Sequence, residues 1–197
     1  MSKRRRNRRL WSTQSLLRLS CAFLCMLVTL PDLTGQQVSQ YDVEAAYLYN
    51  FGKFVRWPAD TSASPKDFDI CIMGRDPFGA TLRRLIAGDQ IAGRNIHERA
   101  VSTARDATGC AIVYIAGSEQ ANLRKAVAAL SGKGELLVSD QPHFLEEGGM
   151  IQFVFMENRV RFEVNLDTAT NSHLAFSSEL LKVAVKVMGT PRTEGAP

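Results

Sequence analysis

The sequence predicts an α/β domain with a mixed, mostly parallel sheet flanked by helices. Three short apolar runs, each followed by a stretch with helical periodicity, indicate this class: FDICIMG before DPFGATLRRLIAG, CAIVYIAG before SEQANLRKAVAALSG, and ELLVSD before QPHFLEEGG. Strand-to-helix units in succession are typical of parallel strands covered by helices. The pattern leaves the order of the strands in the sheet open.

The first element of this domain is an amphipathic helix that begins at Tyr41 and ends at Pro58. Proline cannot continue a helix, and the polar connector ADTSASPKD follows it. Helical spacing places seven residues near one face, which we expect to be buried: Val43, Ala46, Tyr47, Asn50, Phe51, Phe54 and Val55. Further along, NIHERAVS (95–102) alternates like one more strand between the first two units.

The last third of the chain predicts a β-hairpin and a terminal helix. MIQFVFMENRVRFEVNLD reads as two strands joined at residues 157–159, with apolar and polar residues alternating in the second arm. Asp167 can cap a short helical turn, LAFSS looks extended, and Ser177 or Ser178 can start a helix that Gly189 terminates. The expected buried stripe of this helix is Leu180, Leu181, Ala184, Val187 and Met188.

Residues 1–35 have the layout of a secretory signal peptide: a basic cluster (3–9), an apolar stretch (16–30) and a polar break. The apolar stretch has fifteen residues, fewer than the roughly twenty that span a bilayer. We expect export and cleavage, leaving residues 36–197 as one domain with its core at about 41–188. The alternative is an uncleaved anchor, because Leu33 suits a cleavage site poorly.

Removing the leader changes the charge of the protein. The chain has 24 Lys and Arg against 20 Asp and Glu, but seven basic residues and one acidic residue lie in residues 1–35. The remainder, with 17 basic and 19 acidic residues, is slightly acidic. The basic excess therefore belongs to targeting, and we expect no nucleic acid partner.

Cys71 and Cys110 are the two cysteines outside the leader. In an oxidising compartment, a pair in one small domain favours a disulfide. Two buried, unreactive thiols are the alternative.

The sequence contains none of the catalytic motifs GxSxG, HExxH, the P-loop or GxGxxG. We therefore expect that the protein is not an enzyme and binds no cofactor. His97, His143 and His173 belong to separate predicted elements, and we expect no metal site. The best ligand candidates are Arg75 and Ser118, which follow predicted strands where ligands of α/β sheets collect. Ordinary turns are the alternative interpretation of these loops.

A protein interface is the other kind of site that the sequence suggests. Phe54, Trp57 and Phe144 are large apolar residues near element ends, and Arg161 lies on the polar face of the second hairpin arm. Burial in the core would explain the aromatic residues equally well. A solvated sheet face would explain Arg161.

Three blocks of the chain, AAYLYNFGKFVRWP, FDICIMGRDPFG and RFEVNLDTATNSHLAFSSELLKVA, together resemble the YfiR family of periplasmic regulators over residues Tyr41 to Met188. The resemblance implies a Rossmann-like α/β sandwich that tends to dimerise, with Cys71 and Cys110 forming the family's structural disulfide. The family's second cysteine pair has no counterpart in residues 144–153, which puts redox control through that bridge in doubt.

The resemblance also implies a function. Proteins like YfiR repress an inner-membrane diguanylate cyclase, YfiN, and are sequestered by an outer-membrane lipoprotein, YfiB, which changes cyclic di-GMP output and biofilm formation. The leading hypothesis is therefore a periplasmic, dimeric repressor that acts by protein contact. The second hypothesis is a periplasmic binder of small molecules at the strand ends near Arg75 and Ser118.

Overall fold

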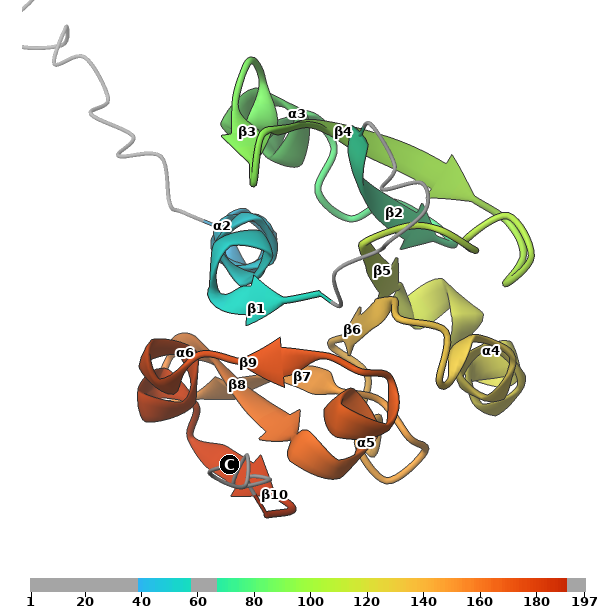
Figure 1. Cartoon of the computed structure of the whole chain (residues 1–197), viewed down its shortest axis with the longest axis vertical. Coiled ribbons are helices and arrows are strands. Elements are labelled where there is room, and N and C mark those ends of the chain that lie inside the picture. Colours follow the sequence, from blue (N-terminus) through green and yellow to red (C-terminus); the bar gives the residue numbers. More distant parts are fainter. Residues whose placement is uncertain (1–38, 58–66, 191–197) are drawn as a thin grey trace, which may run out of the picture. The chain divides into compact units, whose positions relative to one another are not determined.

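The computed structural model describes residues 39–57 and 67–190, so the predicted leader of residues 1–35 lies outside the described residues. One sheet has eight strands (Figure 1). These strands are β2 (Asp67–Met73), β3 (Gln90–Ile91), β4 (Arg94–Val101), β5 (Ile112–Ile115), β6 (Leu136–Ser139), β7 (Ile151–Met156), β8 (Arg159–Asn165) and β10 (Lys186–Met188). Their order is β10-β8-β7-β6-β5-β2-β4-β3.

The pairing confirms the predicted mixed, mostly parallel α/β fold. Every neighbouring pair in this sheet is parallel except β3 with β4 and β7 with β8. The five central strands, β4-β2-β5-β6-β7, all run in one direction, and in chain order they are the second, first, third, fourth and fifth. This is the strand order of flavodoxin-like doubly wound sheets.

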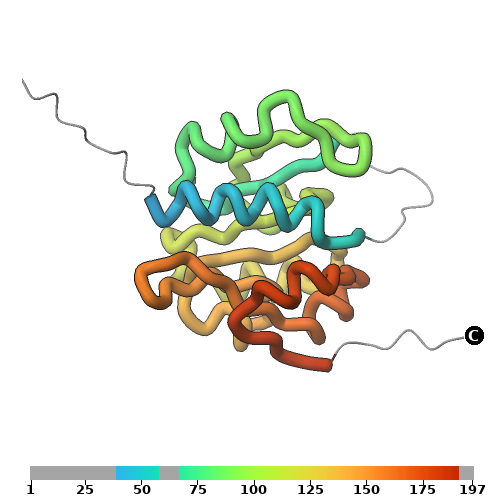
Figure 2. The backbone as a smooth tube through the Cα atoms, turned by 90° about the vertical axis from the view of Figure 1, so that its left-hand side faces the viewer, coloured from blue at the N-terminus to red at the C-terminus, as the bar shows by residue number. Residues whose placement is uncertain are grey.

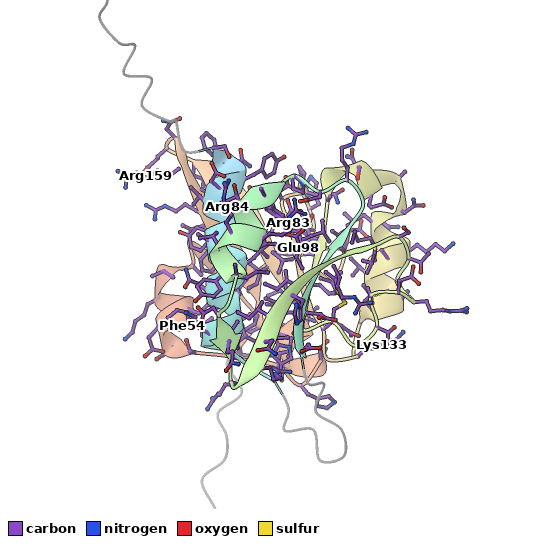
Figure 3. The ribbon with its side chains drawn as sticks, turned by 90° about the horizontal axis from the view of Figure 1, so that it is seen from above. Phe54, Arg83, Arg84, Glu98, Lys133 and Arg159 are labelled. Atoms are coloured by element: carbon purple, nitrogen blue, oxygen red, sulfur yellow. A yellow bond between two sulfur atoms is a disulfide. The ribbon has the colours of Figure 1, made fainter. Side chains whose placement is uncertain are left out.

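The helices are α2 (Gln40–Phe54), α3 (Ala80–Ile86), α4 (Leu123–Leu130), α5 (Leu166–Asn171) and α6 (Ser178–Val183), with a 3-10 helix, η1 (Gly117–Asn122), before α4. They cover both faces of the sheet, with α2 and α3 on one side and α4 on the other (Figure 3). Arg83 on α3 forms an ion pair with Glu98 on β4 at 3.0 Å. In the described residues no helix is long and apolar enough to cross a membrane.

Helix α2 lies across one face of the sheet (Figure 2) and begins with a capping box. The Asp42 amide donates to the Ser39 hydroxyl, and the Ser39 amide donates to the Asp42 carboxylate. The predicted helix is too long, because the chain leaves it after Phe54 and pairs as β1 (Val55–Arg56) with β9 (Ala175–Phe176). Pro58 lies outside the described residues. The buried face also differs from the predicted one and consists of Glu44, Ala45, Leu48, Phe51 and Gly52.

An aromatic cluster fixes α2 to the sheet. Phe51 of α2 stacks on Phe153 of β7, with ring centroids 5.8 Å apart, and meets Phe162 of β8 edge-on at 5.2 Å. Tyr47 contacts the same two rings. Such ring pairs add about 0.5–1.5 kcal/mol each beyond their buried area.

One predicted helix is absent, and another starts at the predicted residues but is too long. QPHFLEEGG forms a series of turns, in which Phe144 is fully buried against Gly149. The final helix ends at Val183 instead of continuing to Gly189, because Lys186–Met188 pairs in parallel with β8 as an edge strand. Of the predicted stripe only Leu180 is fully buried. Asn165 rather than Asp167 caps α5, accepting from the amides of residues 167 and 168.

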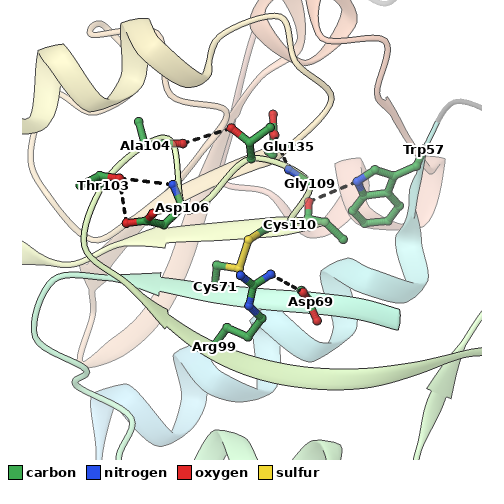
Figure 4. The surroundings of a disulfide bond; sticks show 12 residues. Trp57, Asp69, Cys71, Arg99, Thr103, Ala104, Asp106, Gly109, Cys110 and Glu135 are labelled. Carbon is green, nitrogen blue, oxygen red and sulfur yellow. Dashed lines mark hydrogen bonds and ion pairs between the residues drawn. A yellow bond between two sulfur atoms is a disulfide. The ribbon is translucent and has the colours of Figure 1, made fainter. Parts of the chain in front are cut away.

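The predicted disulfide between Cys71 and Cys110 is present (Figure 4). It joins β2 to the loop before β5, with a Cα–Cα distance of 6.1 Å, and both residues are buried. Nearby, the buried Glu135 accepts a hydrogen bond from the Gly109 amide at 3.0 Å. The bridge thus anchors the loop that leads into the middle of the sheet.

Candidate ligand site at the strand ends

The strand order creates a point where ligands collect in open α/β sheets. The chain turns one way from β2 to β4 and the other way from β5 to β6, so the switch lies between β2 and β5 at their carboxyl ends. The two predicted ligand residues, Arg75 and Ser118, follow these two strands. The structure brings them together, since the Arg75 amide donates to the Ser118 hydroxyl at 2.8 Å.

Gly74 allows this close approach of the two loops. Its φ of +93° is in the left-handed region that favours glycine. A Cβ at this position would lie 2.5 Å from the Ser118 Oγ and 2.9 Å from the Cγ of Glu119. A side chain on residue 74 would therefore push the loops apart.

A cavity of about 500 Å³ opens at this point, and we call it the strand-end cavity. Its volume is within the usual range for small-molecule sites. Four segments contribute to it: the start of α2, the loop after β2, the end of β5 with the loop that follows, and the residue after β6. It is lined by Tyr41, Arg75, Asp76, Pro77, Tyr114, Ala116, Gly117, Ser118 and Asp140.

Buried polar groups lie beside the cavity. Glu44 of α2 has no exposed surface, and its carboxylate accepts from the Tyr114 hydroxyl at 3.2 Å and from the Gln40 amide group at 2.8 Å. The Tyr41 hydroxyl donates to Oδ2 of Asp140 at 3.3 Å. The other carboxylate oxygen of Asp140 is buried and has no hydrogen-bond partner among the described residues.

Burial changes the acidity of this cluster. Loss of solvent raises the pKa of Glu44 to about 7, and the nearby charge of Asp140 acts in the same direction. Burial also raises the pKa of the Tyr114 hydroxyl, and the charge of Glu44 raises it further. Tyr114 thus stays a hydrogen-bond donor at any physiological pH.

Two buried side chains hold the edge of the cavity in place. The Ser139 hydroxyl donates to the Ile115 carbonyl at 2.7 Å, and the Gln141 side chain donates to the Ala116 carbonyl at 3.1 Å. Both residues are buried. These bonds tie the end of β6 to the end of β5, so the cavity is supported by the sheet rather than by loops alone.

Sequence reasoning found Arg75 and Ser118 but missed Glu44, Tyr114 and Asp140. Asp140 directly follows the strand ELLVS, so the strand-end rule, applied to the third unit, would have found it. Glu44 is a charged residue on the buried face of α2, and a charged residue among apolar ones is a signal of a buried polar site that the sequence contains. Its pairing with Tyr114 links positions 70 residues apart and has no sequence signal.

The predicted interface residues have different environments. Phe54 is 41% exposed at the end of α2. Trp57 is half-buried, with its indole N–H donating to the Ala111 carbonyl at 3.2 Å, and Arg161 is half-exposed on β8. Phe144 belongs to the core, so its prediction as a contact residue is wrong.

Phe54 contributes to a groove of about 300 Å³ between α2 and α6, which we call the α2–α6 groove. Most of its surface is apolar side chain, and Val183 at its rim is 58% exposed. The lining residues are Tyr47, Asn50, Phe51, Phe54, Phe162, Glu179, Leu180 and Val183.

Metal-ligand side chains do not gather in the part of the chain that the structure describes: no group of three or more His, Cys, Asp or Glu residues could hold an ion there. His97 lies 3.5 Å from Asp67 at the start of β2. His143 and His173 are in separate turns.

Comparison with known proteins gives a family match, and the solved structures that it finds include two of low similarity. The sequence model of the YfiR/HmsC-like family matches residues 41–185. A conserved domain protein from Vibrio cholerae is 12% identical, with a TM-score of 0.44 over 60% of this chain and 54% of that one. The ABC domain from Streptococcus pneumoniae in complex with L-Trp is 11% identical, with a TM-score of 0.44 over 61% and 55%. The chain thus spans about half the length of these two structures.

Proposed function

The chain belongs to the YfiR/HmsC-like family, and we propose that it represses an inner-membrane diguanylate cyclase of the YfiN type by protein contact, lowering cyclic di-GMP signalling. The observation that carries this proposal is the family match over residues 41–185, which runs from α2 almost to β10. The family suggests a periplasmic regulator of cyclic di-GMP signalling. In this proposal the protein acts without catalysis and without a cofactor.

The proposed location is the periplasm. The basic and apolar segments of residues 1–35 support export. The Cys71–Cys110 disulfide supports an oxidising compartment, because such bonds persist outside the cytoplasm.

Repression would be a shift in the population of the cyclase. A regulator that binds the inactive receptor more tightly than the active one shifts the equilibrium tenfold for each 1.4 kcal/mol of difference in binding free energy, roughly. An outer-membrane lipoprotein of the YfiB type would compete by sequestering the regulator. We also propose that the regulator is a homodimer.

The α2–α6 groove is the surface that we propose for contact with the cyclase. Phe54 and Val183 expose apolar area there, and partly exposed aromatic residues at a pocket are common anchors of protein interfaces. Glu179 adds a charged group at the edge.

Deletion of the gene tests the regulatory role. We expect cellular cyclic di-GMP, measured by mass spectrometry, to rise several-fold and to return to its original level when the full chain is restored. An unchanged level in several growth conditions would contradict repression.

A pair of variants tests the contact surface separately. Phe54→Ala should fail to restore repression, whereas Leu85→Ala on α3 should restore it, because Leu85 is equally exposed (40%) but lies outside the groove. Immunoblotting of the periplasm should show equal amounts of both variants. Full repression by Phe54→Ala would exclude the groove while leaving the regulatory role intact.

The strand-end cavity favours a second candidate function, the binding of a small molecule near Arg75 and Ser118. The site lies where α/β sheets bind ligands, and it has a suitable volume. A metabolite panel measured by thermal shift tests this function, since a ligand that binds the folded state raises its stability by mass action. If no compound in the panel raises the melting temperature, protein contact remains as the proposed function.

A further inference from the structure

We propose that the strand-end cavity binds a small organic amine, whose protonated amino group is held by Asp140 and by the hydroxyls of Tyr41 and Tyr114. This inference rests on the second candidate function, the binding of a small molecule. It concerns the class of ligand, which the strand order alone does not determine.

The charges around the cavity favour a cation. Two carboxylates, those of Asp76 and Asp140, line the cavity, against one guanidinium, that of Arg75. Arg75 is exposed to solvent, where its charge is screened, whereas the Oδ1 atom of Asp140 is buried. The Tyr114 hydroxyl already donates to Glu44, so the free hydrogen-bonding group beside the interior is the acceptor of Asp140.

Asp140 has an acceptor that the protein does not satisfy. Its Oδ2 accepts from Tyr41, while its Oδ1 is buried and has no partner among the described residues. An unpaired buried acceptor is costly, and an ammonium group carries three donors. An ammonium group thus has enough donors for Asp140 and for both tyrosine oxygens.

The geometry suits an organic cation better than a metal ion. Calcium takes six to eight oxygen ligands, roughly, and the described residues contain no cluster of three ligand side chains. A volume of about 500 Å³ also leaves room for a hydrocarbon body. The walls formed by Pro77, Ala116 and the ring of Tyr114 are apolar and can contact such a body.

Three compounds with the same four-carbon chain test the class of ligand: butylamine, butanol and butyrate. The protein, purified from the periplasm of cells that express the full chain, is titrated with each compound and followed by NMR. We expect saturable shifts of the backbone amides of Tyr114, Ser118 and Asp140 with butylamine, and no saturable shifts with butanol or butyrate. Calcium chloride is titrated as the inorganic cation and is expected to leave these amides unshifted.

Matched variants test the residues. Asp140→Asn keeps the shape and removes the charge, and we expect butylamine affinity to fall at least about tenfold, as for loss of a charged hydrogen bond. Asp167→Asn on α5, outside the cavity lining, should leave affinity unchanged. Tyr41→Phe removes one hydroxyl at the surface and should weaken binding less, which keeps a readout if Asp140→Asn folds poorly.

Several results would overturn the inference. These are equal binding of butanol or butyrate, unchanged affinity in both Asp140→Asn and Tyr41→Phe, shifts confined to other parts of the protein, or saturation of the same amides by calcium. Saturable binding of butyrate alone would reject an amine but keep a small-molecule site. If no compound binds, the amine class is rejected, and the metabolite panel decides independently whether the cavity binds anything.

Discussion

At the scale of one residue, Glu44 shows how a single carboxylate on a buried helix face affects the whole site. It lies on the buried face of α2, where an apolar side chain would pack without cost, yet its carboxylate is fully buried. Two hydrogen bonds, from Gln40 and Tyr114, offset part of the loss of hydration. The remaining cost appears as the raised pKa.

This pKa predicts how stability depends on pH. Between the ordinary value of 4.5 and the folded value of about 7, the folded state holds a proton that the unfolded state has lost, so stability falls as pH rises through this window. The fall should reach up to about 3 kcal/mol above pH 7. Glu44→Gln, which keeps an acceptor for Tyr114, should remove most of this slope and be more stable than the natural protein at pH 8.

Urea unfolding at pH 5, 6, 7 and 8 measures this effect. The hydroxyls of Tyr114 and Tyr41 also lie near Glu44, and burial raises the pKa of each above its ordinary value of 10.0, so both stay protonated from pH 5 to 8 and add no slope in either protein. Glu146→Gln, in an exposed turn, is the control and should keep the natural slope. An unchanged slope in Glu44→Gln would show that this carboxylate is not the titrating group.

The sequence allowed some site residues to be predicted and not others, for a physical reason. Arg75 and Ser118 could be predicted as site residues because each closely follows a strand, and parallel strands end at the same edge of a sheet. For Phe144 the sequence left an interface and the core open, and the structure places it in the core, because its burial depends on non-local packing that sequence spacing does not encode.

At the scale of elements, the β7–β8 hairpin was predictable because its arms are rich in β-branched and aromatic residues. The observed loop has two residues, Glu157 and Asn158, with φ of 49° and 59°. Positive φ at both positions is the geometry of a type I′ turn, which matches the twist of the strands. Asparagine tolerates this region, but glutamate is strained there.

We expect Glu157→Asn to stabilise the protein by up to about 1 kcal/mol, because it relieves this strain without the entropy cost of glycine. Urea unfolding at constant pH measures the change. The matched control is Glu146→Asn, which removes the same charge from an exposed turn residue of ordinary φ. Equal gains in the two variants would mean that loss of charge, rather than backbone geometry, is responsible.

The error in the last helix has a different origin. Residues 180–188 have apolar positions at helical spacing, but VAVKV is also rich in β-branched residues, which favour strands. The exposed edge of β8 decides between the two, since Lys186–Met188 pairs with it and the Val185 amide donates to the Phe162 carbonyl at 2.9 Å. A tertiary contact thus overrides a local pattern.

For the whole molecule, the class of fold was predictable and the strand order was not. Repeated strand-to-helix units indicate parallel strands, but the placement of β2 between β4 and β5 arises from pairing between distant segments. The strand-end cavity depends on this order, because it lies where the chain switches direction. Its volume and its buried acceptors could therefore be known only from the structure.

The Cys71–Cys110 disulfide acts on the whole molecule, because it restrains the unfolded chain over a separation of 39 residues. In the chain-entropy view this restraint stabilises the folded state by about 4 kcal/mol. The double variant Cys71→Ala, Cys110→Ala should lose about this much free energy of unfolding in urea. The small cavities left by two buried sulfurs add to the loss.

The natural protein unfolded in the presence of a reductant is the control, and its stability should fall toward that of the double variant but stay above it, because the two reduced thiols still fill their places in the core. The reductant should leave the double variant itself unaffected. Equal stability of the oxidised protein and the double variant would mean that native packing, rather than the bridge, restrains this loop. A measured loss of the expected size would make the fold dependent on an oxidising compartment, which is the condition that the proposed periplasmic role requires.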